Sequence, residues 1–480
     1  MKECASELAL PLTKLFSHSF KCGKVPSSWK FAQVQPVAKP GDSSNPANYR
    51  PISLLPVISK VMERLINKSI MSFLRHHKLL SDRQYGFQSQ RSTADLLSVL
   101  FQSWSDALDS GSEVRAVSLD ISKAFDKVWH DGLLSKLHCY GISGLLLNWL
   151  KDYLSHRSQA VFVDGVQSKA RTINAGVPQG SVLGPTLFLI FINDLLESTS
   201  NPIHSFADDS TLHTCLPTNS REQIVDTLES DLAKIEEWGK QWLVTFNASK
   251  TSQLIISRRK KQDHPVVHFQ GTTLSSSSSM KLLGISFDGK LSLDMHIHNK
   301  VRTASRMMGV LYRLRSTLPL SSMLQLYKAL IRPHLEYCSN LIDSATKKSL
   351  QLIDNLQVRA MKILGCSDLL KENILPLSHR RNVGCLSLLY RYFHGCCSSE
   401  LLGLVPTPQH LGSTTRHSSD AHPFSLSIPR SRTSHHQKSF FPRSVRLWNS
   451  LPSSVFPNDY HLAQFKRNVN QYLKTQLHFQ

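Results

Sequence analysis

The sequence has no C-x-x-C pair and no apolar run long enough to cross a bilayer. Its nine cysteines are scattered and odd in number, which argues against a disulfide framework or a zinc finger and favours a reducing, intracellular compartment. The longest apolar stretch, residues 187–192, is far shorter than the roughly 20 residues of a membrane helix. An acidic residue close to Met1 argues against a secretory signal. We therefore expect a soluble protein that does not bind a membrane.

Acidic residues are also few, with 35 Asp and Glu against 56 Lys and Arg, and the formal net charge is +21. The excess lies at the two ends of the chain: residues 1–100 carry a net charge of +8, residues 101–300 of −2, and residues 301–480 of +15. Hydrophobic residues make up 41%, enough for a sizeable core. This pattern predicts a polyanionic partner, whose binding would weaken as the salt concentration rises.

Hydrophobic periodicity predicts a mixed α/β region followed by basic helices. In the first part, helices are expected over residues 5–22, 54–80, 131–154, 185–198 and 224–242. Strands are expected over residues 31–38, 116–120, 203–207, 211–215, 253–257 and 281–287, with a further hairpin around Gly165. The second part is predicted to hold helices over residues 293–316, 321–337 and 346–365, and two helical stretches after residue 440.

Two of the predicted apolar strands end in acidic residues. Asp208 and Asp209 follow residues 203–207, and Asp120 ends residues 116–120. Adjacent carboxylates repel each other, so a folded protein rarely keeps such a pair without a compensating cation. Hard oxygen ligands select Mg²⁺, and two ions about 4 Å apart can stabilise both oxygens of an in-line phosphoryl transfer. Taken alone, Asp208 and Asp209 can also be interpreted as an ordinary turn, because turns favour Asp.

Further motifs appear in a fixed order around these acids. They are NYRPISL at residues 48–54, YGF at 85–87, VSLDISKAFD at 117–126, GVPQGSVLGP at 176–185, FADD at 206–209, FN with KT at 246–251, and LGI at 283–285. Their order and spacing resemble the motifs of reverse transcriptases, in particular those of non-LTR retrotransposons of the LINE, jockey and chicken-repeat type. The resemblance covers residues 20–288 and continues more weakly to the end of the chain.

The resemblance implies an RNA-directed DNA polymerase that uses two Mg²⁺ ions, with Mn²⁺ as a substitute. The metal ligands would be Asp120, Asp208 and Asp209, assisted by the backbone carbonyl of Ile121. One ion would lower the pKa of the primer 3′-hydroxyl, and the other would bind the triphosphate and the pyrophosphate leaving group. The implied partners are an RNA template, a DNA primer and deoxynucleoside triphosphates. An endonuclease domain encoded upstream and action in the nucleus are also expected from the resemblance.

Five other residues receive roles from the same resemblance. Phe125 would lie under the sugar of the incoming nucleotide and clash with a 2′-hydroxyl, or would be an ordinary core residue. Gln179 and Gly180 would support the nucleotide and the template, where glycine permits close backbone approach. Lys250 would donate a proton to pyrophosphate, or would be a surface lysine. Arg50 would contact the triphosphate, or would cap a turn.

The implied fold is α+β: the fingers and palm of a right-hand polymerase, with an antiparallel palm sheet, followed by an α-helical thumb and a small C-terminal region. We expect a partial N-terminal fingers segment, fingers and palm, a basic helical thumb, a linker rich in Ser, His and Pro, and a C-terminal helical appendage. These units would span residues 1–19, 20–288, 289–400, 401–439 and 440–480, respectively.

Helical spacing in the predicted thumb places Arg302, Arg306 and Arg313 on one face. The apolar residues Val301, Met308 and Leu311 are turned away from that face. We expect these arginines to bind the template–primer duplex, although a solvated charged face would look the same.

Two alternatives to a reverse transcriptase stay open. An RNA replicase is disfavoured because it would need a smaller residue than Phe125. A catalytically inactive, nucleic-acid-binding relic of a retroelement would retain the same acids and the same basic surface.

Overall fold

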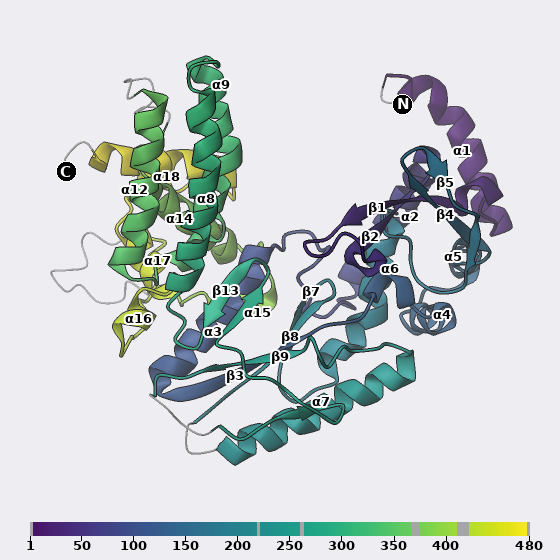
Figure 1. Cartoon of the computed structure of the whole chain (residues 1–480), viewed down its shortest axis with the longest axis horizontal. Helices are drawn as coiled ribbons and strands as arrows, with labels where there is room; N and C mark the ends of the chain where they lie inside the picture. The colour runs from purple at the N-terminus through teal and green to yellow at the C-terminus, as the bar shows by residue number, and fades with distance from the viewer. Residues whose placement is uncertain (1–2, 218–220, 260–263, 366–373, 410–421, 478–480) are drawn as a thin grey trace.

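The computed structural model describes residues 3–217, 221–259, 264–365, 374–409 and 422–477. A four-stranded antiparallel sheet lies at the centre, and Figure 1 shows a second sheet with its helices on one side of it and a helical region on the other. The fold is therefore α+β with an antiparallel central sheet, as the sequence predicts, while the second sheet also contains a parallel pair of strands. Within the described ranges, no helix combines the length and the apolar character that crossing a membrane requires.

The central sheet has the strand order β7-β8-β3-β9. Its strands are β3 (Ser112–Leu119), β7 (Ile203–Phe206), β8 (Asp209–Pro217) and β9 (Ser252–Ile256). Strand β3 is buried along nearly its whole length because both faces of the sheet are covered. Val114 and Ala116 pack into one hydrophobic core, while Val117 and Leu119, on the opposite face, pack into another.

Helix α3 (Thr93–Ser110), which the periodicity did not predict, covers the first face. The Ser92 hydroxyl accepts a hydrogen bond from the Asp95 amide and begins the helix, and Gly111, with φ of +86°, ends it. The opposite face is covered by α6 (Leu183–Ile192) and α7 (Arg221–Trp242). Helix α6 is buried on all sides, which explains its unbroken apolar sequence.

The second sheet has the order β2-β1-β4-β5, with β6 paired to β4. Its strands are β1 (Phe31–Ala38), β2 (Tyr49–Leu54), β4 (Arg157–Val163), β5 (Val166–Gln167) and β6 (Arg171–Ile173). The helices around it are α1 (Ala5–Cys22), α2 (Val57–His76), α4 (His130–Cys139) and α5 (Gly144–Leu154). The single helix predicted over residues 131–154 is wrong, because Gly141, with φ of +85°, interrupts it between α4 and α5. The helix predicted from residue 54 begins three residues later, after β2.

A hairpin of β12 (Ser279–Leu282) and β13 (Ile285–Asp288) leads into the helical region. The single strand predicted over residues 281–287 is therefore wrong: the chain reverses at Leu283 and Gly284, which both have positive φ.

The helical region contains α8 (Asp294–Leu314), α9 (Leu320–Leu326), α10 (Arg332–Glu336), α11 (Ser339–Ile342), α12 (Lys347–Leu364), α14 (Leu377–Phe393), α15 (Ser399–Leu404), α16 (Ser434–Gln437), α17 (Phe440–Asn449) and α18 (Leu462–Leu477). Smaller elements are the hairpin of β10 (His268–Phe269) and β11 (Thr272–Thr273), a π-helical turn η5 (Tyr327–Ile331), and the 3₁₀ turns η1 (Ser27–Trp29), η2 (Pro46–Asn48), η3 (Ala124–Lys127), η4 (Asn193–Glu197) and η6 (Ser453–Val455).

Helix α3 joins the helical region through a stripe of polar side chains on one of its faces, which we call the α3 stripe. Its members are Asp95, Ser98, Gln102, Asp106 and Asp109, at helical spacing. In the same order, they bond to Tyr392 at 2.7 Å, Asn340 at 2.8 Å, Ser439 at 3.2 Å, His436 at 2.7 Å and Thr433 at 2.7 Å. Apolar α3 residues beside the stripe share one core with the helical region, so the two are packed as well as hydrogen-bonded.

The predicted linker and appendage both lie against this core where they are described. Residues 422–439 include α16, whose His436 bonds to α3. Residues 410–421 of that linker lie outside the described residues. Helices α17 and α18 pack on α14, where the rings of Tyr390 and Phe465 stack with their centroids 4.0 Å apart. The predicted thumb and the predicted appendage contribute buried side chains to one hydrophobic core. The division of the chain into five units stays a prediction.

Candidate active site

Three acidic residues lie at the same end of the central sheet. Asp208 and Asp209 form the turn between β7 and β8, which we call the acidic turn, and Phe206 pairs with Asp209 across it. Asp120 directly follows β3, whose last residue, Leu119, pairs with Ser210 of β8. The neighbouring strands therefore carry all three carboxylates to one rim, as their positions in the sequence suggested.

The acids interact electrostatically across this rim. Burial raises the pKa of Asp208, and the negative charge of Asp120 raises it further. The pKa of Asp209 is also raised, first by burial and then by the charges of Asp208 and Asp120. Among the residues that the structure describes, no group of three Asp, Glu, His or Cys side chains is already arranged to hold an ion. Such mutual repulsion is nevertheless what a bound cation would relieve, so the donor set fits a hard divalent ion.

A cleft of about 1020 Å³ opens beside this rim, between the central and the second sheet. It is lined by most residues that the sequence singled out: Arg50, Asp120, Ile121, Phe125, Gln179, Asp208 and Lys250. Asp209 and Gly180 do not line it. The cleft therefore brings together two of the acids, the aromatic candidate and both cationic candidates.

The cleft also carries cations that the sequence motifs did not identify. The charges of Arg50 and Lys39 oppose the rise in the pKa of Asp208, which places both near the acidic turn. Lys123 lines the same cleft and, with Lys39, opposes the rise in the pKa of Asp126. The only signal for Lys39 in the sequence was its place before a Pro-Gly turn between two strands. Acids and cations thus face one cavity, which suits an anionic ligand that arrives with metal ions.

Phe125 lies half-buried in the lining of the cleft. Its ring stacks on Phe188 of α6 with a centroid separation of 4.5 Å, and Phe87 meets it edge-on at 6.2 Å. The carbonyl oxygen of Phe125 accepts a hydrogen bond of 2.8 Å from the Val177 amide. One face of the ring therefore packs on a core residue, and the residue also borders the cavity; its contact with the sugar of a nucleotide stays a prediction.

Gln179 and Gly180 join the cleft to the second sheet. The Gln179 side-chain amide donates to the Asp126 carboxylate at 2.9 Å, and the Gln179 backbone carbonyl accepts from the Ser53 backbone N–H at 2.6 Å. Gly180 has φ of +122°, and a Cβ at this position would lie 2.5 Å from the Ser53 carbonyl oxygen. The glycine is required by this close approach to β2. The Asp126 carboxylate is thus held by Gln179.

Lys250 lies in the segment that extends the sheet beyond β3. The Asn247 amide donates to the Asp120 carbonyl at 2.9 Å, and Ile121 bridges to Phe246. The Lys250 ammonium group lies 3.8 Å from an Asp120 carboxylate oxygen and is 68% exposed. Such an exposed pair adds little stability, but it leaves the ammonium group free to move within the cleft.

Residues 84–86, whose role the sequence did not reveal, contact the backbone of the acidic turn at Ala207. Ala207 adopts φ of +59°, which is strained for a residue with a Cβ. Gln84, which is buried, accepts the Ala207 N–H at 2.9 Å and donates to the Ala207 carbonyl at 3.3 Å. Gly86 approaches so closely that a Cβ there would lie 2.3 Å from the Ala207 nitrogen. The YGF motif gave the position of this segment but not its function.

The three arginines selected in the predicted thumb lie far from the acidic turn in sequence, on α8. Arg302, Arg306 and Arg313 are exposed, while Met308 and Leu311 are buried, so the helix is amphipathic in the orientation expected. In Figure 1, α8 lies on the side of the helical region that faces the second sheet and α1, while α12 lies farther from them.

Comparisons with known proteins agree with these features. The sequence profile of the reverse transcriptase (RNA-dependent DNA polymerase) family matches residues 37–287. The probable RNA-directed DNA polymerase from transposon X-element of Drosophila melanogaster is 29% identical over 388 residues, which cover 78% of this chain and 42% of that protein. The RNA-directed DNA polymerase from mobile element jockey of the same species is 32% identical over 365 residues, which cover 73% and 39%. The chain thus spans about two fifths of the length of these relatives.

Among solved structures, telomerase from Candida albicans in complex with a fragment of telomeric RNA matches with a TM-score of 0.43 and 11% identity, covering 75% of this chain and 67% of that one. The family profile matches more than half of the chain and contains the acidic turn, Asp120 and most of the cleft. This chain belongs to the reverse transcriptase family.

Proposed function

We propose that this chain is a template-directed polymerase that copies RNA into DNA by two-metal-ion nucleotidyl transfer. Reverse transcriptases use divalent metal ions. The observation that carries the proposal is the meeting of Asp120 with Asp208 and Asp209 at one rim, beside a cleft lined by cations and by Phe125. Buried carboxylates whose pKa is raised further by a neighbouring carboxylate, as at Asp208 and Asp209, are suited to Mg²⁺, with Mn²⁺ as a substitute.

The metal ligands in this proposal are Asp120, Asp208 and Asp209, with the Ile121 carbonyl assisting. Two bound Mg²⁺ ions would supply a more acidic primer hydroxyl and stabilisation of the leaving pyrophosphate. The protein's own contribution is to hold the carboxylates on neighbouring strands, where the paired backbone of β3 and β8 fixes their spacing. The Lys250 ammonium group, 3.8 Å from Asp120, is the candidate proton donor to pyrophosphate.

The nucleotide is proposed to enter the cleft with its triphosphate toward Arg50, Lys39 and Lys123. Guanidinium and ammonium groups neutralise phosphate charge, and here they already face the carboxylates. The ring of Phe125, fixed against Phe188, would occupy the space that a 2′-hydroxyl needs. Gln179 and Gly180 would support the nucleotide and the template. They lie in a loop that contacts Ser53 of β2.

An RNA template and a DNA primer are the proposed partners, and Arg302, Arg306 and Arg313 of α8 are their proposed phosphate contacts. An endonuclease encoded with this chain remains a prediction.

Primer extension tests the function. The purified chain should add dTTP to an oligo(dT) primer on poly(rA) in the presence of Mg²⁺ and should stop when EDTA is added. Asp208→Asn should lower the rate by at least about 10³-fold, because ligand loss removes several kcal/mol of transition-state stabilisation. Template–primer affinity should stay nearly unchanged.

Asp131→Asn is the matched control, since Asp131 is an exposed acid in the first turn of α4, away from the cleft. It should extend the primer as the wild type does. A wild-type chain that binds template–primer but adds no nucleotide would contradict the proposal and favour the inactive, nucleic-acid-binding alternative. Loss of binding in Asp208→Asn would show instead that the acidic turn is a structural feature.

A further inference from the structure

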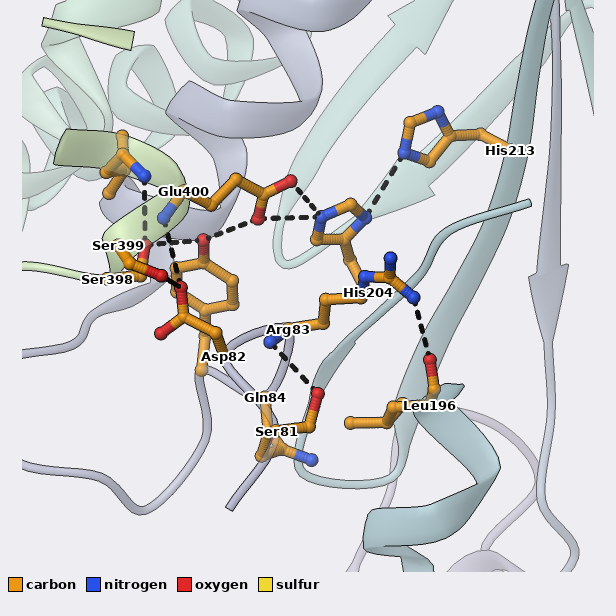
Figure 2. A network of polar contacts seen from close by, with 12 residues as sticks. Ser81, Asp82, Arg83, Gln84, Leu196, His204, His213, Ser398, Ser399 and Glu400 are labelled. Atoms are coloured by element: carbon orange, nitrogen blue, oxygen red, sulfur yellow. Dashed lines mark hydrogen bonds and ion pairs between the residues drawn. The ribbon is translucent and has the colours of Figure 1, made fainter. Parts of the chain in front are cut away.

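A buried polar network joins the helical region to strand β7, outside the cleft (Figure 2). Its centre is His204, which is only 1% exposed. The His204 Nε2 atom lies 2.8 and 2.9 Å from the two carboxylate oxygens of Glu400, in the first turn of α15. The other ring nitrogen lies 3.2 Å from His213 of β8. Polar groups buried this deeply destabilise a fold unless they are paired, so the contact with Glu400 is required once His204 faces inward.

The same turn of α15 binds the segment that precedes Gly86. The Tyr85 hydroxyl lies 2.9 Å from the Ser398 hydroxyl and donates to Glu400 at 3.2 Å. Asp82 accepts the Glu400 N–H at 3.0 Å and also a hydrogen bond from the Ser399 hydroxyl. The Glu400 carboxylate therefore contacts His204 of β7 and the Tyr85 hydroxyl. The Glu400 backbone N–H contacts Asp82, so Glu400 is joined to the segment from Asp82 to Tyr85 in two ways.

That segment in turn holds the acidic turn. The Tyr85 amide donates to the Ser205 carbonyl at 2.8 Å, one residue after His204. Gln84 accepts the Ala207 N–H and donates to the Ala207 carbonyl, immediately before Asp208. Ala207 keeps its strained positive φ in this grip. An unbroken series of contacts therefore runs from Glu400 to the backbone of the acidic turn along two paths, one through His204 and one through Tyr85 and Gln84.

We propose that Glu400 is a positioning residue for Asp208 and Asp209: it holds the acidic turn in its ion-binding geometry and makes that geometry depend on the seating of the helical region. The inference rests on the proposed function in taking the acidic turn as the ion site. Helix α15 packs against both α14 and α3, so a shift of the helical region moves Glu400. Partners behind metal ligands typically alter metal affinity or activity by 10–100-fold when removed, although they touch no ion.

Hydrogen–deuterium exchange on the full chain, without nucleic acid or metal, tests the positioning directly. In Glu400→Ala, amides of residues 203–212 should exchange about tenfold faster, because loss of the Glu400 carboxylate removes the path through His204 and weakens the path through Tyr85. Exchange in α2 and α7 should stay unchanged. Leu402→Ala is the control, since Leu402 is an exposed residue of the same helix, and it should leave residues 203–212 as in the wild type. Unchanged exchange in residues 203–212, or an equal rise throughout the chain, would overturn the proposal.

Glu400→Gln separates positioning from charge. Its amide can accept from His204 and donate to the Tyr85 hydroxyl, so the exchange of residues 203–212 should return close to that of the wild type. If Gln behaved as Ala does, the hydrogen-bonded positioning would be refuted in favour of a purely ionic contact.

Primer extension supplies the functional readout. Glu400→Ala should raise the Mg²⁺ concentration for half-maximal rate about tenfold, with template–primer Kd unchanged. Glu400→Gln should restore the Mg²⁺ dependence. An unchanged Mg²⁺ dependence in Glu400→Ala contradicts the inference even if the enzyme is active. A wild-type chain that does not extend primers refutes the proposed function, while the exchange result still decides whether Glu400 positions the turn.

Discussion

Asp208 and Asp209 each carry a carboxylate that the rest of the site makes costly to ionise. Burial and the charge of Asp120 raise both pKa values, the charge of Asp208 raises the pKa of Asp209 further, and Arg50 offsets these rises only in part. A group whose pKa is raised on folding contributes stability that is present below its ordinary pKa and is lost as the pH rises through the raised value. The metal-free site therefore opposes folding at neutral pH.

Asp208→Asn should consequently raise the Tm of the metal-free chain at pH 8, and this gain should shrink as the pH falls and the wild-type carboxylates become protonated. Saturating Mg²⁺ should reduce the gain at pH 8, because a bound cation relieves the same repulsion. Thermal melts of both proteins in EDTA and in Mg²⁺ check this. A Tm difference that is independent of pH would contradict the electrostatic explanation, and Asp131→Asn should show no such pH dependence.

Phe125 leads to a prediction about sugar selection. Phe125→Val should increase the incorporation of ribonucleotides relative to deoxynucleotides by at least about tenfold, equivalent to about 1.4 kcal/mol, because the shorter side chain leaves room for a 2′-hydroxyl. Single-nucleotide addition with rNTP and dNTP measures the ratio. Phe87→Ala removes the edge-on neighbour of Phe125 without shortening Phe125 itself, so its ratio should stay near that of the wild type. An unchanged ratio in Phe125→Val would mean that the residue serves only the core.

Among the elements, α8 has the clearest division of faces. Met308 and Leu311 are buried, and Arg302, Arg306 and Arg313 are exposed. Phosphate contacts release counterions, so log Kd should vary linearly with log salt, with a slope that reflects the number of phosphates neutralised. An exposed cationic face on a helix is thus distinguishable from a merely solvated one by a binding measurement.

Replacing Arg302, Arg306 and Arg313 by Gln should make the salt slope shallower by up to about 2.7, at about 0.9 per lost phosphate contact on a B-form duplex. Processivity should fall, while single-nucleotide addition at saturating template–primer changes little. Fluorescence anisotropy across a salt series gives the slope. The control replaces Lys347, Lys348 and Lys362, three exposed cations of α12, and removes the same charge. If both triple variants shift the slope equally, α8 makes no specific contact with the duplex.

The predictability of these elements from sequence depended on their environment. Strands β3 and β7 could be predicted because their apolar runs end in Asp, and α8 because one face is apolar and the other basic. Helix α3 could not, because its polar residues at 95, 98, 102, 106 and 109 bond to partners that lie far away in the chain, and all of them except the exposed Asp106 are buried. Hydrophobic periodicity reveals a helix that has one buried and one exposed face, and α3 has few exposed residues.

The same reason explains what was missed in the site. Asp120, Asp208 and Asp209 are recognisable from their spacing, but Gln84 acts through backbone atoms of Ala207, which no side-chain pattern reveals. Lys39 reaches the cleft only because β1 and β2 fold over it. Tertiary contacts of this kind are decided by topology and not by local sequence.

At the scale of the whole molecule, one core connects the central sheet to the end of the chain. It contains Phe101 and Trp104 of α3, Tyr390 of α14, Trp448 of α17 and Phe465 of α18. The Trp448 ring nitrogen donates to the Phe424 carbonyl at 2.7 Å, and the side chain is fully buried. The C-terminal helices should therefore stabilise the sheet that carries the acids, although they lie apart from it in the sequence.

Trp448→Ala should lower the free energy of unfolding by about 3–5 kcal/mol, as expected when a large buried side chain leaves a cavity. The loss should be shared, so that hydrogen exchange rises in α3 as well as in α17. Urea unfolding followed by far-ultraviolet circular dichroism measures the first effect. Val358→Ala, at an exposed position of α12, should change stability by no more than about 0.5 kcal/mol. Increased exchange confined to residues 440–477 would show that the C-terminal helices unfold separately.

The α3 stripe has a consequence for heredity. Each of its polar residues is satisfied by a partner that lies more than two hundred residues further along the chain, as Asp109 is by Thr433. A substitution of a stripe residue or of its partner leaves the remaining polar group without a hydrogen bond. Lineages that keep a working fold should therefore accept changes in matched pairs. Copies released from selection would accumulate unmatched changes instead. The stripe could therefore serve as a record, within any one gene, of whether its product has recently been needed.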